Sequence, residues 1–519
     1  MSKKHPKGLI AASLSNMGER FGFYTMMAIL VLFLMSKFGL SGETAGTIYA
    51  TFYFSIYILA LAGGVIADRT KKYKSTIQTG IILMAVGYLI LAVPTVTPVS
   101  NLTVSLGTAC LGLFLIAFGN GLFKGNLQAL VGQMYDNPQY SKMRDAGFSL
   151  FYMFINVGAI FAPLMAIAAR NLCLKVNGFG YDQDLPALCH QYLDGTISAD
   201  GLENITKLSS QVSLNGAPTN LATFASEYLN VFNTGYHYAF GIAIVAMLIS
   251  LTIYMINKKN FPDPALAAQA KEAAAAGLTD EDKAKLKMDV KEVKQRLYAL
   301  FAVFAVVIFF WFSFHQNGLT LTFFAQQYTD LSWLKIPLGV VEIQGAEIFQ
   351  SVNPLFVVLL TPVIMGLFGW MRAKGIEPST PKKIGIGMGI AACAYIIMTI
   401  GSLSLPPAAE VREMGGLAQE MRVTPFLLFG TYIVLTIAEL FISPLGISFV
   451  SKVAPPQYQG IMQGCWLGAT AIGNQLLFIG GILYYSIPLW MTWTVFVVAC
   501  LLSMTVMFSM LKWLERVAK

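Results

Sequence analysis

Long apolar stretches dominate this chain of 519 residues and limit the folds that are open to it. A helix of about 20 apolar residues crosses a bilayer core about 30 Å thick, and its backbone groups must pair within the segment because lipid offers no hydrogen bonds. Windows of that length identify twelve candidate spans, near 9–37, 45–67, 76–96, 104–130, 146–170, 236–256, 297–325, 347–371, 384–404, 425–450, 461–484 and 488–512. The sequence therefore predicts an all-α membrane protein with twelve transmembrane helices.

The composition excludes several other classes of protein. Charged residues make up 12% of the chain and hydrophobic residues 56%, whereas soluble domains carry roughly 25% charged residues. A soluble enzyme, a disordered chain and a disulfide-rich secreted scaffold are incompatible with these values. The sequence has no Cys/His cluster with metal-ligand spacing, no phosphate-binding glycine loop and no nucleophile beside a base. We therefore expect no enzyme, no metal and no other cofactor.

The positive charges indicate the orientation of the chain. Twelve spans put both termini on one side, and most of the 35 Lys and Arg residues lie in the segments of that side. The opposite side holds Lys37, Arg170, Lys175, Lys207, Lys335, Arg412 and Arg422. By the positive-inside rule the termini are cytoplasmic. The net charge of +8 then reflects topology and contact with anionic lipid, and we expect no nucleic-acid partner.

Two long connections divide the chain. Residues 257–296 are rich in Ala, Lys and Glu and predict a cytoplasmic amphipathic linker between two six-helix bundles. The N-terminal bundle comprises 1–170 and 236–256, and the C-terminal bundle comprises 297–519.

An external segment, residues 171–235, interrupts the N-terminal bundle between its fifth and sixth spans. It is compatible with a small ordered cap or with a flexible excursion. It contains Cys173 and Cys189, which could pair outside the cytoplasm or remain free.

Ionisable side chains inside the spans are the strongest functional signal. A charge at mid-membrane costs about 2.5–3.5 kcal/mol on insertion scales, so such a residue is a functional candidate by default. The spans contain Glu19, Arg20, Lys124, His315 and Glu439, with Asn156 and Asn353 as uncharged polar groups. Their spread over both bundles predicts a central hydrated site with opposite charges at its two ends.

Structural roles are the alternative for these residues. Glu19 and Arg20 are adjacent and point about 100° apart on a helix, so we do not expect them to neutralise each other. Buried structural pairs could instead join Arg20 to Glu439, or Glu19 to Lys124. The two Asn side chains could serve contacts between helices.

The turn after the second span carries a separate motif. Residues 63–69, Gly-Gly-Val-Ile-Ala-Asp-Arg, are followed by further lysines. They resemble the loop signature of the major facilitator superfamily, which implies a conformational gating role for Asp68 and Arg69. A solvated turn is the alternative.

Five further motifs resemble the proton-coupled oligopeptide transporters of that superfamily, in the same order and in the corresponding spans. They are Asn16-Met-Gly-Glu19-Arg20-Phe21-Gly-Phe23-Tyr24, Gly119-Asn-Gly121-Leu-Phe-Lys124-Gly125-Asn126, Phe151-Tyr152-Met-Phe-Ile155-Asn156-Val-Gly158, Phe349-Gln350-Ser351-Val-Asn353-Pro354 and Glu439-Leu440-Phe441-Ile-Ser443-Pro444-Leu-Gly446. The resemblance covers nearly the whole chain and implies the major facilitator fold.

The resemblance also implies roles for individual residues. Glu439 would hold the amino terminus of a di- or tripeptide, while Arg20 and Lys124 would lie toward its carboxylate and take part in proton coupling. Glu19 would be the proton carrier, with His315 as a second titrating group that also contacts substrate. The remaining substrate-binding positions would be Tyr24, Tyr57, Asn156, Asn353 and Ser443, with Trp311 and Trp466 as aromatic walls.

Three positions depart from the family pattern. The first Glu of the first-span motif is Asn16, the usual Arg seven residues after Arg20 is Met27, and the usual acid of the seventh span is His315. In the family the last two positions form a charge pair at the external gate. Here both have changed, which avoids leaving one buried charge unpaired.

We accordingly expect a bacterial inner-membrane carrier, monomeric in lipid, that imports small peptides or peptide-like zwitterions by proton symport and alternating access. The alternative carrier is a facilitator or exchanger for an organic anion or a modified peptide, with altered proton coupling. A receptor that uses residues 171–235 would bind a ligand without flux.

Overall fold

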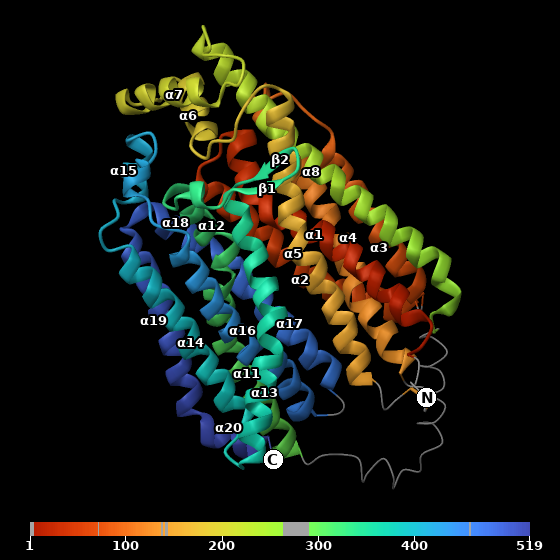
Figure 1. Cartoon of the computed structure of the whole chain (residues 1–519). Coiled ribbons are helices and arrows are strands. Elements are labelled where there is room, and N and C mark those ends of the chain that lie inside the picture. Colours follow the sequence, from red (N-terminus) through yellow and green to blue (C-terminus); the bar gives the residue numbers. More distant parts are fainter. Residues whose placement is uncertain are drawn as a thin grey trace.

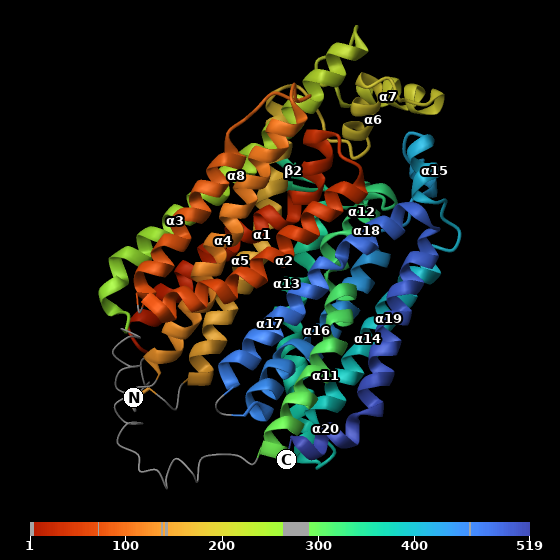
Figure 2. The same cartoon turned by 180° about the vertical axis from the view of Figure 1, so that it is seen from behind.

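A computed structural model describes residues 5–70, 72–135, 139–140, 144–262, 290–455 and 458–518. Within these ranges, twelve helices are long and apolar enough to cross a membrane, which confirms the predicted spans and the all-α membrane fold. Figures 1 and 2 show them as two side-by-side bundles. Both termini lie at one end, here called the terminal side, and two short helices cover the opposite end, here called the cap side.

The N-terminal bundle consists of α1 (Gly8–Phe38), α2 (Gly42–Thr70), α3 (Tyr73–Ala92), α4 (Leu102–Met134), α5 (Arg144–Val176) and α8 (Leu221–Asn257). Asparagine side chains begin two of these helices, because Asn101 accepts a hydrogen bond from the Val104 amide and Asn220 accepts one from the Thr223 amide. Helix α1 is buried along most of its length and packs against α4, α5 and α8, so it forms the centre of the bundle.

The spans of the C-terminal bundle are less regular. Its seventh span runs from α11 (Val290–Phe314) through the 3-10 turn η3 (His315–Gly318) to α12 (Thr320–Gln327), and its eighth joins η5 (Ala346–Ser351) to α13 (Val352–Ala373). The others are α14 (Thr380–Gly401), α16 (Phe426–Val453), α17 (Gln459–Gln475) with α18 (Leu477–Ser486), and α19 (Leu489–Ser509), followed by α20 (Leu511–Val517). The helix break at η3 matters for the site because His315 lies there.

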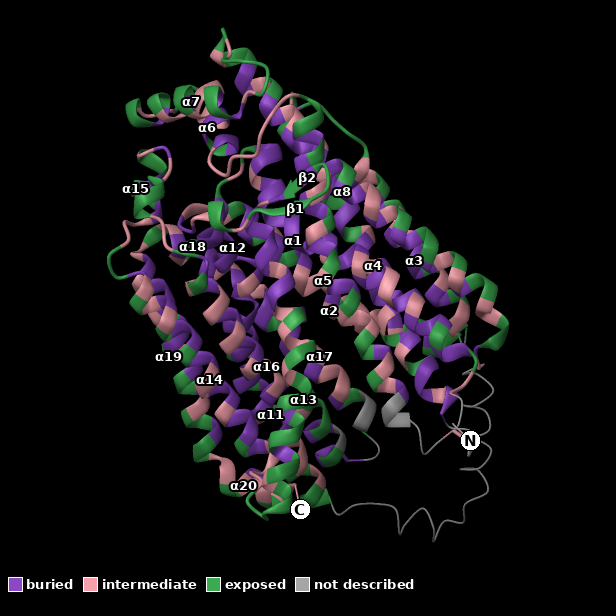
Figure 3. Ribbon diagram, viewed as in Figure 1, coloured by how far each residue is buried: buried purple, intermediate pink, exposed green. Residues whose placement is uncertain are grey.

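Apolar side chains cover the outside of both bundles. Figure 3 shows buried residues inside each bundle and exposed residues on the outer faces of the helices. Large exposed side chains such as Leu89, Ile249 and Leu502 have no protein neighbour to bury them. This pattern is the one that lipid requires.

The cap-side segment is ordered. Because α5 runs on to Val176 and α8 begins at Leu221, the segment between the spans is 177–220, shorter than the expected 171–235. It contains α6 (Leu185–Leu193) and α7 (Ala199–Val212), where Ser198 accepts a hydrogen bond from the Gly201 amide. Cys173 and Cys189 are both buried free thiols.

Smaller elements connect the spans of the C-terminal bundle on the cap side. A hairpin of β1 (Ile336–Leu338) and β2 (Val341–Ile343) precedes η5, and η4 (Leu331–Trp333) precedes the hairpin. Helix α15 (Ala408–Glu413) and η6 (Gln419–Met421) lie between α14 and α16.

Most of the predicted linker 257–296 lies outside the described residues. Its first part includes η2 (Lys258–Asn260), and from Val290 the chain already belongs to α11. The amphipathic character of residues 263–289 stays a prediction.

Helices α2 and α4 cross at very short range within the 63–69 motif. A Cβ atom added to Gly63 would lie 2.1 Å from the Gly121 carbonyl oxygen, whereas one added to the next residue, Gly64, would meet nothing within 4 Å. The first glycine of the motif is therefore required by packing and the second is not.

This contrast predicts different effects of the same added methyl group. Gly63→Ala should lower the stability by about 1–3 kcal/mol, because the backbones of α2 and α4 must move apart. Gly64→Ala should leave the stability unchanged. Thermal unfolding of the two detergent-purified variants provides the measurement, and equal melting temperatures would contradict the close crossing.

Candidate substrate and proton site

Glu19 lies at the centre of a buried polar cluster in the N-terminal bundle. Arg20 donates from Nε to Glu19 Oε2 at 2.6 Å and from Nη2 to Oε1 at 2.7 Å. Asn120 of α4 donates from Nδ2 to Oε1 at 2.6 Å. All three residues are at most 4% exposed. A carboxylate buried this deeply is stabilised by a charged partner and by hydrogen bonds together.

The expectation that Glu19 and Arg20 would not neutralise each other is wrong. Their Cα–Cβ bonds diverge around the helix, but the long arginine side chain bends back and its guanidinium meets the carboxylate with two parallel bonds. Both residues are at most 4% exposed, and the neighbour on the same helix becomes the partner that compensates each buried charge.

Lys124 and Glu439 remain without an ionic partner among the residues that the structure describes. The Lys124 ammonium lies 5.0 Å from the centre of the Tyr57 ring, a cation–π contact. Glu439 accepts from Asn353 Nδ2 at 2.8 Å, and Asn353 also donates to the Thr436 hydroxyl. The proposed structural pairs Arg20–Glu439 and Glu19–Lys124 are not formed.

Tyrosines join the two sets of charges. Tyr24 and Tyr57 each interact electrostatically both with Arg20 of the N-terminal bundle and with Glu439 of the C-terminal bundle. Lys124 interacts in the same way with Arg20, Glu19 and His315. Glu439 and Arg20, which come from different bundles, therefore share Tyr24 and Tyr57 as aromatic neighbours.

His315 lies between aromatic rings of the two bundles. Its ring stacks on Trp311 at 4.9 Å and meets the tilted ring of Tyr53 of α2 at 4.7 Å, measured between ring centres. Its Nδ1 atom bonds to the Asn474 side-chain oxygen at 2.5 Å. Since that oxygen can only accept, Nδ1 carries the proton. Met27 is buried in α1.

Four other predicted residues lie at the edge of this cluster or away from it. Asn156 donates to the Tyr152 carbonyl of its own helix, as a structural residue would. Trp466 packs against Phe304 and Gly446, and Ser443 lies one turn after Glu439 on α16. Asp68, at the terminal-side end of α2, accepts a hydrogen bond from the Tyr73 hydroxyl.

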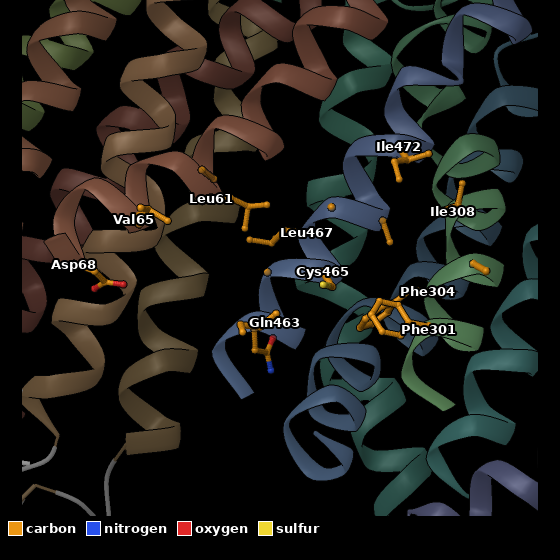
Figure 4. A pocket seen from close by; sticks show the side chains of 17 residues that line it. Leu61, Val65, Asp68, Phe301, Phe304, Ile308, Gln463, Cys465, Leu467 and Ile472 are labelled. Atoms are coloured by element: carbon orange, nitrogen blue, oxygen red, sulfur yellow. The ribbon is translucent and has the colours of Figure 1, made fainter. Parts of the chain in front are cut away.

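A cleft of about 1000 Å³ on the terminal side is lined by residues of α2, α11 and α17. Figure 4 shows Leu61, Val65 and Asp68 on one wall, and Phe301, Phe304 and Ile308 across from them. Of the predicted residues, Asp68 is the one in its lining; Arg69, next along α2, is exposed. Helices α2 and α17 still meet beside this cleft, because a Cβ atom added to Gly464 would lie 3.1 Å from the Leu61 side chain.

Among the described parts of the chain, no group of three or more His, Cys, Asp or Glu residues could hold a metal ion. The polar groups of the central cluster are suited to binding a charged organic solute and a proton.

Comparison with known proteins decides the family. The model of the POT family (PTR2) matches residues 74–188 and 265–483. The chain belongs to the POT family. The predicted family resemblance is thereby confirmed.

Curated POT relatives match along most of the chain. The peptide transporter YePEPT of Yersinia enterocolitica is 29% identical over 487 residues, which cover 91% of this chain and 86% of the relative. A di-/tripeptide transporter of Lactococcus lactis subsp. lactis is 24% identical, with 91% and 88% covered.

Solved POT structures share the fold. A peptide transporter POT in complex with sulfate has a TM-score of 0.71 at 22% identity, covering 100% of this chain and 96% of the other. A POT family transporter in complex with 5-aminolevulinic acid has a TM-score of 0.70 at 20% identity, with 100% and 98% covered.

On the cap side of this POT protein, a buried ion pair joins the bundles. Arg170 of α5 and Glu347 of η5 form a salt bridge and are both fully buried. Tyr236 donates to the same carboxylate at 2.8 Å, and Arg170 donates to the Gln344 carbonyl at 2.8 Å. The Arg170 guanidinium also lies 4.2 Å from the Tyr181 ring centre. The bundles are thus closed against each other on this side.

The cap adds further contacts to the closure. Asp184 pairs with Arg422 at 2.5 Å, and Asn204 donates to the Met414 carbonyl at 2.9 Å. Ser198 donates to the Glu413 carbonyl at 2.5 Å. The cap belongs to the N-terminal half and these partners belong to the C-terminal half, so it bridges the two.

Sequence reasoning missed this ion pair. The predicted fifth span ends at Arg170 and the predicted eighth begins at Glu347, so the sequence places Arg170 with the external segments and gives no role to Glu347. Lys37 was assigned in the same way, but it is 1% exposed and donates to the Thr95 carbonyl at 2.5 Å. A charge at the edge of an apolar stretch is a signal that could have found all three.

The ion pair predicts a specific order of stabilities. Arg170→Gln and Glu347→Gln should each cost about 3–5 kcal/mol, because each leaves its partner charge buried and unpaired. The double variant should be more stable than either single one. Thermal unfolding in detergent measures this order. As a control, Arg372→Gln removes an exposed ion pair with Glu377 and should change little.

Proposed function

We propose that this POT family protein imports small peptides or peptide-like zwitterions across a bacterial inner membrane by proton-driven alternating access. The observation that carries the proposal is a pair of opposite charges, one in each bundle, without an ionic partner among the described residues. Lys124 lies 5.0 Å from the centre of the Tyr57 ring, and Glu439 accepts from Asn353 Nδ2 at 2.8 Å. A zwitterion with charges at both ends matches such an arrangement, because each end finds an opposite charge.

In this scheme each end of the substrate has its own partner. Glu439, held by Asn353, receives the amino terminus, and Lys124 receives the carboxylate. Neither Glu439 nor Lys124 has to break a salt bridge within the described chain before the substrate binds. Trp311, Trp466 and the tyrosines provide apolar walls that accept varied side chains. The related transporters named for di-/tripeptides, and the fold neighbour with bound 5-aminolevulinic acid, support this substrate class.

The positive-inside distribution favours a cytoplasmic terminal side. The cleft lined by α2, α11 and α17 then opens inward, while the Arg170–Glu347 pair and the cap close the outside. This arrangement is the inward-open state of an alternating-access cycle. The outward-open state requires that pair to separate into water, where both charges are solvated.

Protons drive the cycle through Glu19. Protonation of Glu19 removes the negative charge that binds Arg20, and the freed guanidinium then turns toward the substrate carboxylate. Substrate and proton are thereby coupled through one arginine. We propose a monomer as the transporting unit.

Uptake into proteoliposomes tests the function. An acidic outside should drive accumulation of a labelled dipeptide above its external concentration, and dissipating the gradient should abolish accumulation while counterflow persists. Counterflow with no response to the gradient would instead favour a facilitator or exchanger. Binding without any flux would favour a receptor.

The Glu439→Gln variant tests the binding of the amino terminus. It should weaken dipeptide binding at least about tenfold, equivalent to about 1.4 kcal/mol, because the ammonium group loses its counter-charge. The matched control, Glu227→Gln, changes an exposed carboxylate on the cap side and should bind as the wild type does. Equal affinities of the two variants would contradict the assignment.

A further inference from the structure

Asn120 stands between Gly119 and Gly121 on α4 and has a polar atom that the contacts described so far do not use. Its Nδ2 atom donates to Glu19, but its Oδ1 atom is buried and has no hydrogen-bond partner among the described residues. The side chain is fully buried. A fully buried hydrogen-bond acceptor without a donor is rare in proteins and requires an explanation.

The orphaned atom becomes useful once Glu19 binds a proton. The ionised carboxylate accepts bonds from Arg20 and from the amide of Asn120. A protonated carboxyl group carries an O–H donor and needs an acceptor, which neither a guanidinium nor an ammonium can supply. The amide oxygen of Asn120 can. A half-turn of the amide about its last torsion exchanges Nδ2 and Oδ1 in front of Glu19.

We propose that Asn120 is a positioning residue for proton coupling, whose amide supports Glu19 as a donor in the ionised state and as an acceptor in the protonated state. The inference rests on the proposed function, in which Glu19 carries the proton. One proton passes from external water to the Glu19 carboxylate, the amide turns, and Arg20 is released. When the proton returns to cytoplasmic water, the amide turns back and Arg20 binds Glu19 again.

The other groups that face Glu19 do not replace this role. Arg20 lies on the same helix, as does Tyr24, which interacts electrostatically with both Glu19 and Arg20. Lys124 lies one turn further along α4, and Tyr88 lies on α3. The Tyr88 hydroxyl interacts electrostatically with Glu19, but it is buried without a hydrogen-bond partner in the described chain. It is the competing acceptor, and the test must separate it from Asn120.

The pH dependence of dipeptide uptake tests the inference. Asn120→Asp puts a second carboxyl group 2.6 Å from Glu19, the Nδ2–Oε1 distance in the wild type. Two carboxylates at this distance hold a proton between them, so half-maximal uptake should move at least about one unit to higher pH. The matched control is Asn126→Asp on the same helix, because Asn126 is also buried but bonds to the Gly63 and Leu122 carbonyls. It should keep the wild-type pH of half-maximal uptake.

Infrared difference spectroscopy between acidic and neutral pH provides a second readout. It requires only purified protein in detergent and no transport assay. Glu19→Gln identifies the carboxyl C=O band of protonated Glu19. Asn120→Ala should shift that band to higher frequency, since the O–H loses its acceptor, whereas Tyr88→Phe should leave it in place. The inference is overturned if Asn120→Asp and Asn126→Asp give the same pH profile, or if the band responds to Tyr88→Phe instead. If wild-type uptake ignores the proton gradient, it is the proposed function that fails.

Discussion

A charged side chain in a lipid-embedded helix must find a partner, and this requirement organises the whole molecule. Glu19 satisfies it with Arg20 and Asn120, and Arg170 satisfies it with Glu347. Lys124 and Glu439 are different, because their described partners are an aromatic ring and a neutral amide. An unneutralised charge inside a membrane protein costs free energy, and a ligand of opposite charge reduces that cost. The central site is therefore defined by Lys124 and Glu439, the two charged side chains that no described residue of opposite charge neutralises.

The two bundles are joined on the cap side and leave a cleft on the terminal side. The residues at the usual positions for an external charge pair are Met27 and His315, which do not form one. Arg170 and Glu347 instead join the bundles, and Tyr236 and the Gln344 carbonyl bind the same two charges. The cap bridges the bundles as well, through Asp184 and Arg422.

The sequence predicts the twelve spans, the fold and the POT family correctly, because apolar length and motif order are local properties of the chain. Partner choice is not local. The pairing of Glu19 with Arg20 depends on how a flexible side chain bends in a dry interior, and helical periodicity does not contain that information. Arg170 and Glu347 fall at the ends of apolar windows, where the sequence cannot distinguish a solvated end from a buried contact. The roles of the central residues remain predictions.

The central claim is that opposite charges of the two halves hold the two ends of one zwitterion. Competition binding to the wild-type protein tests it most directly, with dialanine, its N-acetyl form and its C-terminal amide as competitors. The account predicts that dialanine competes strongly and that each blocked form competes far more weakly, since each lacks one of the two charges. Equal competition by all three compounds would contradict it.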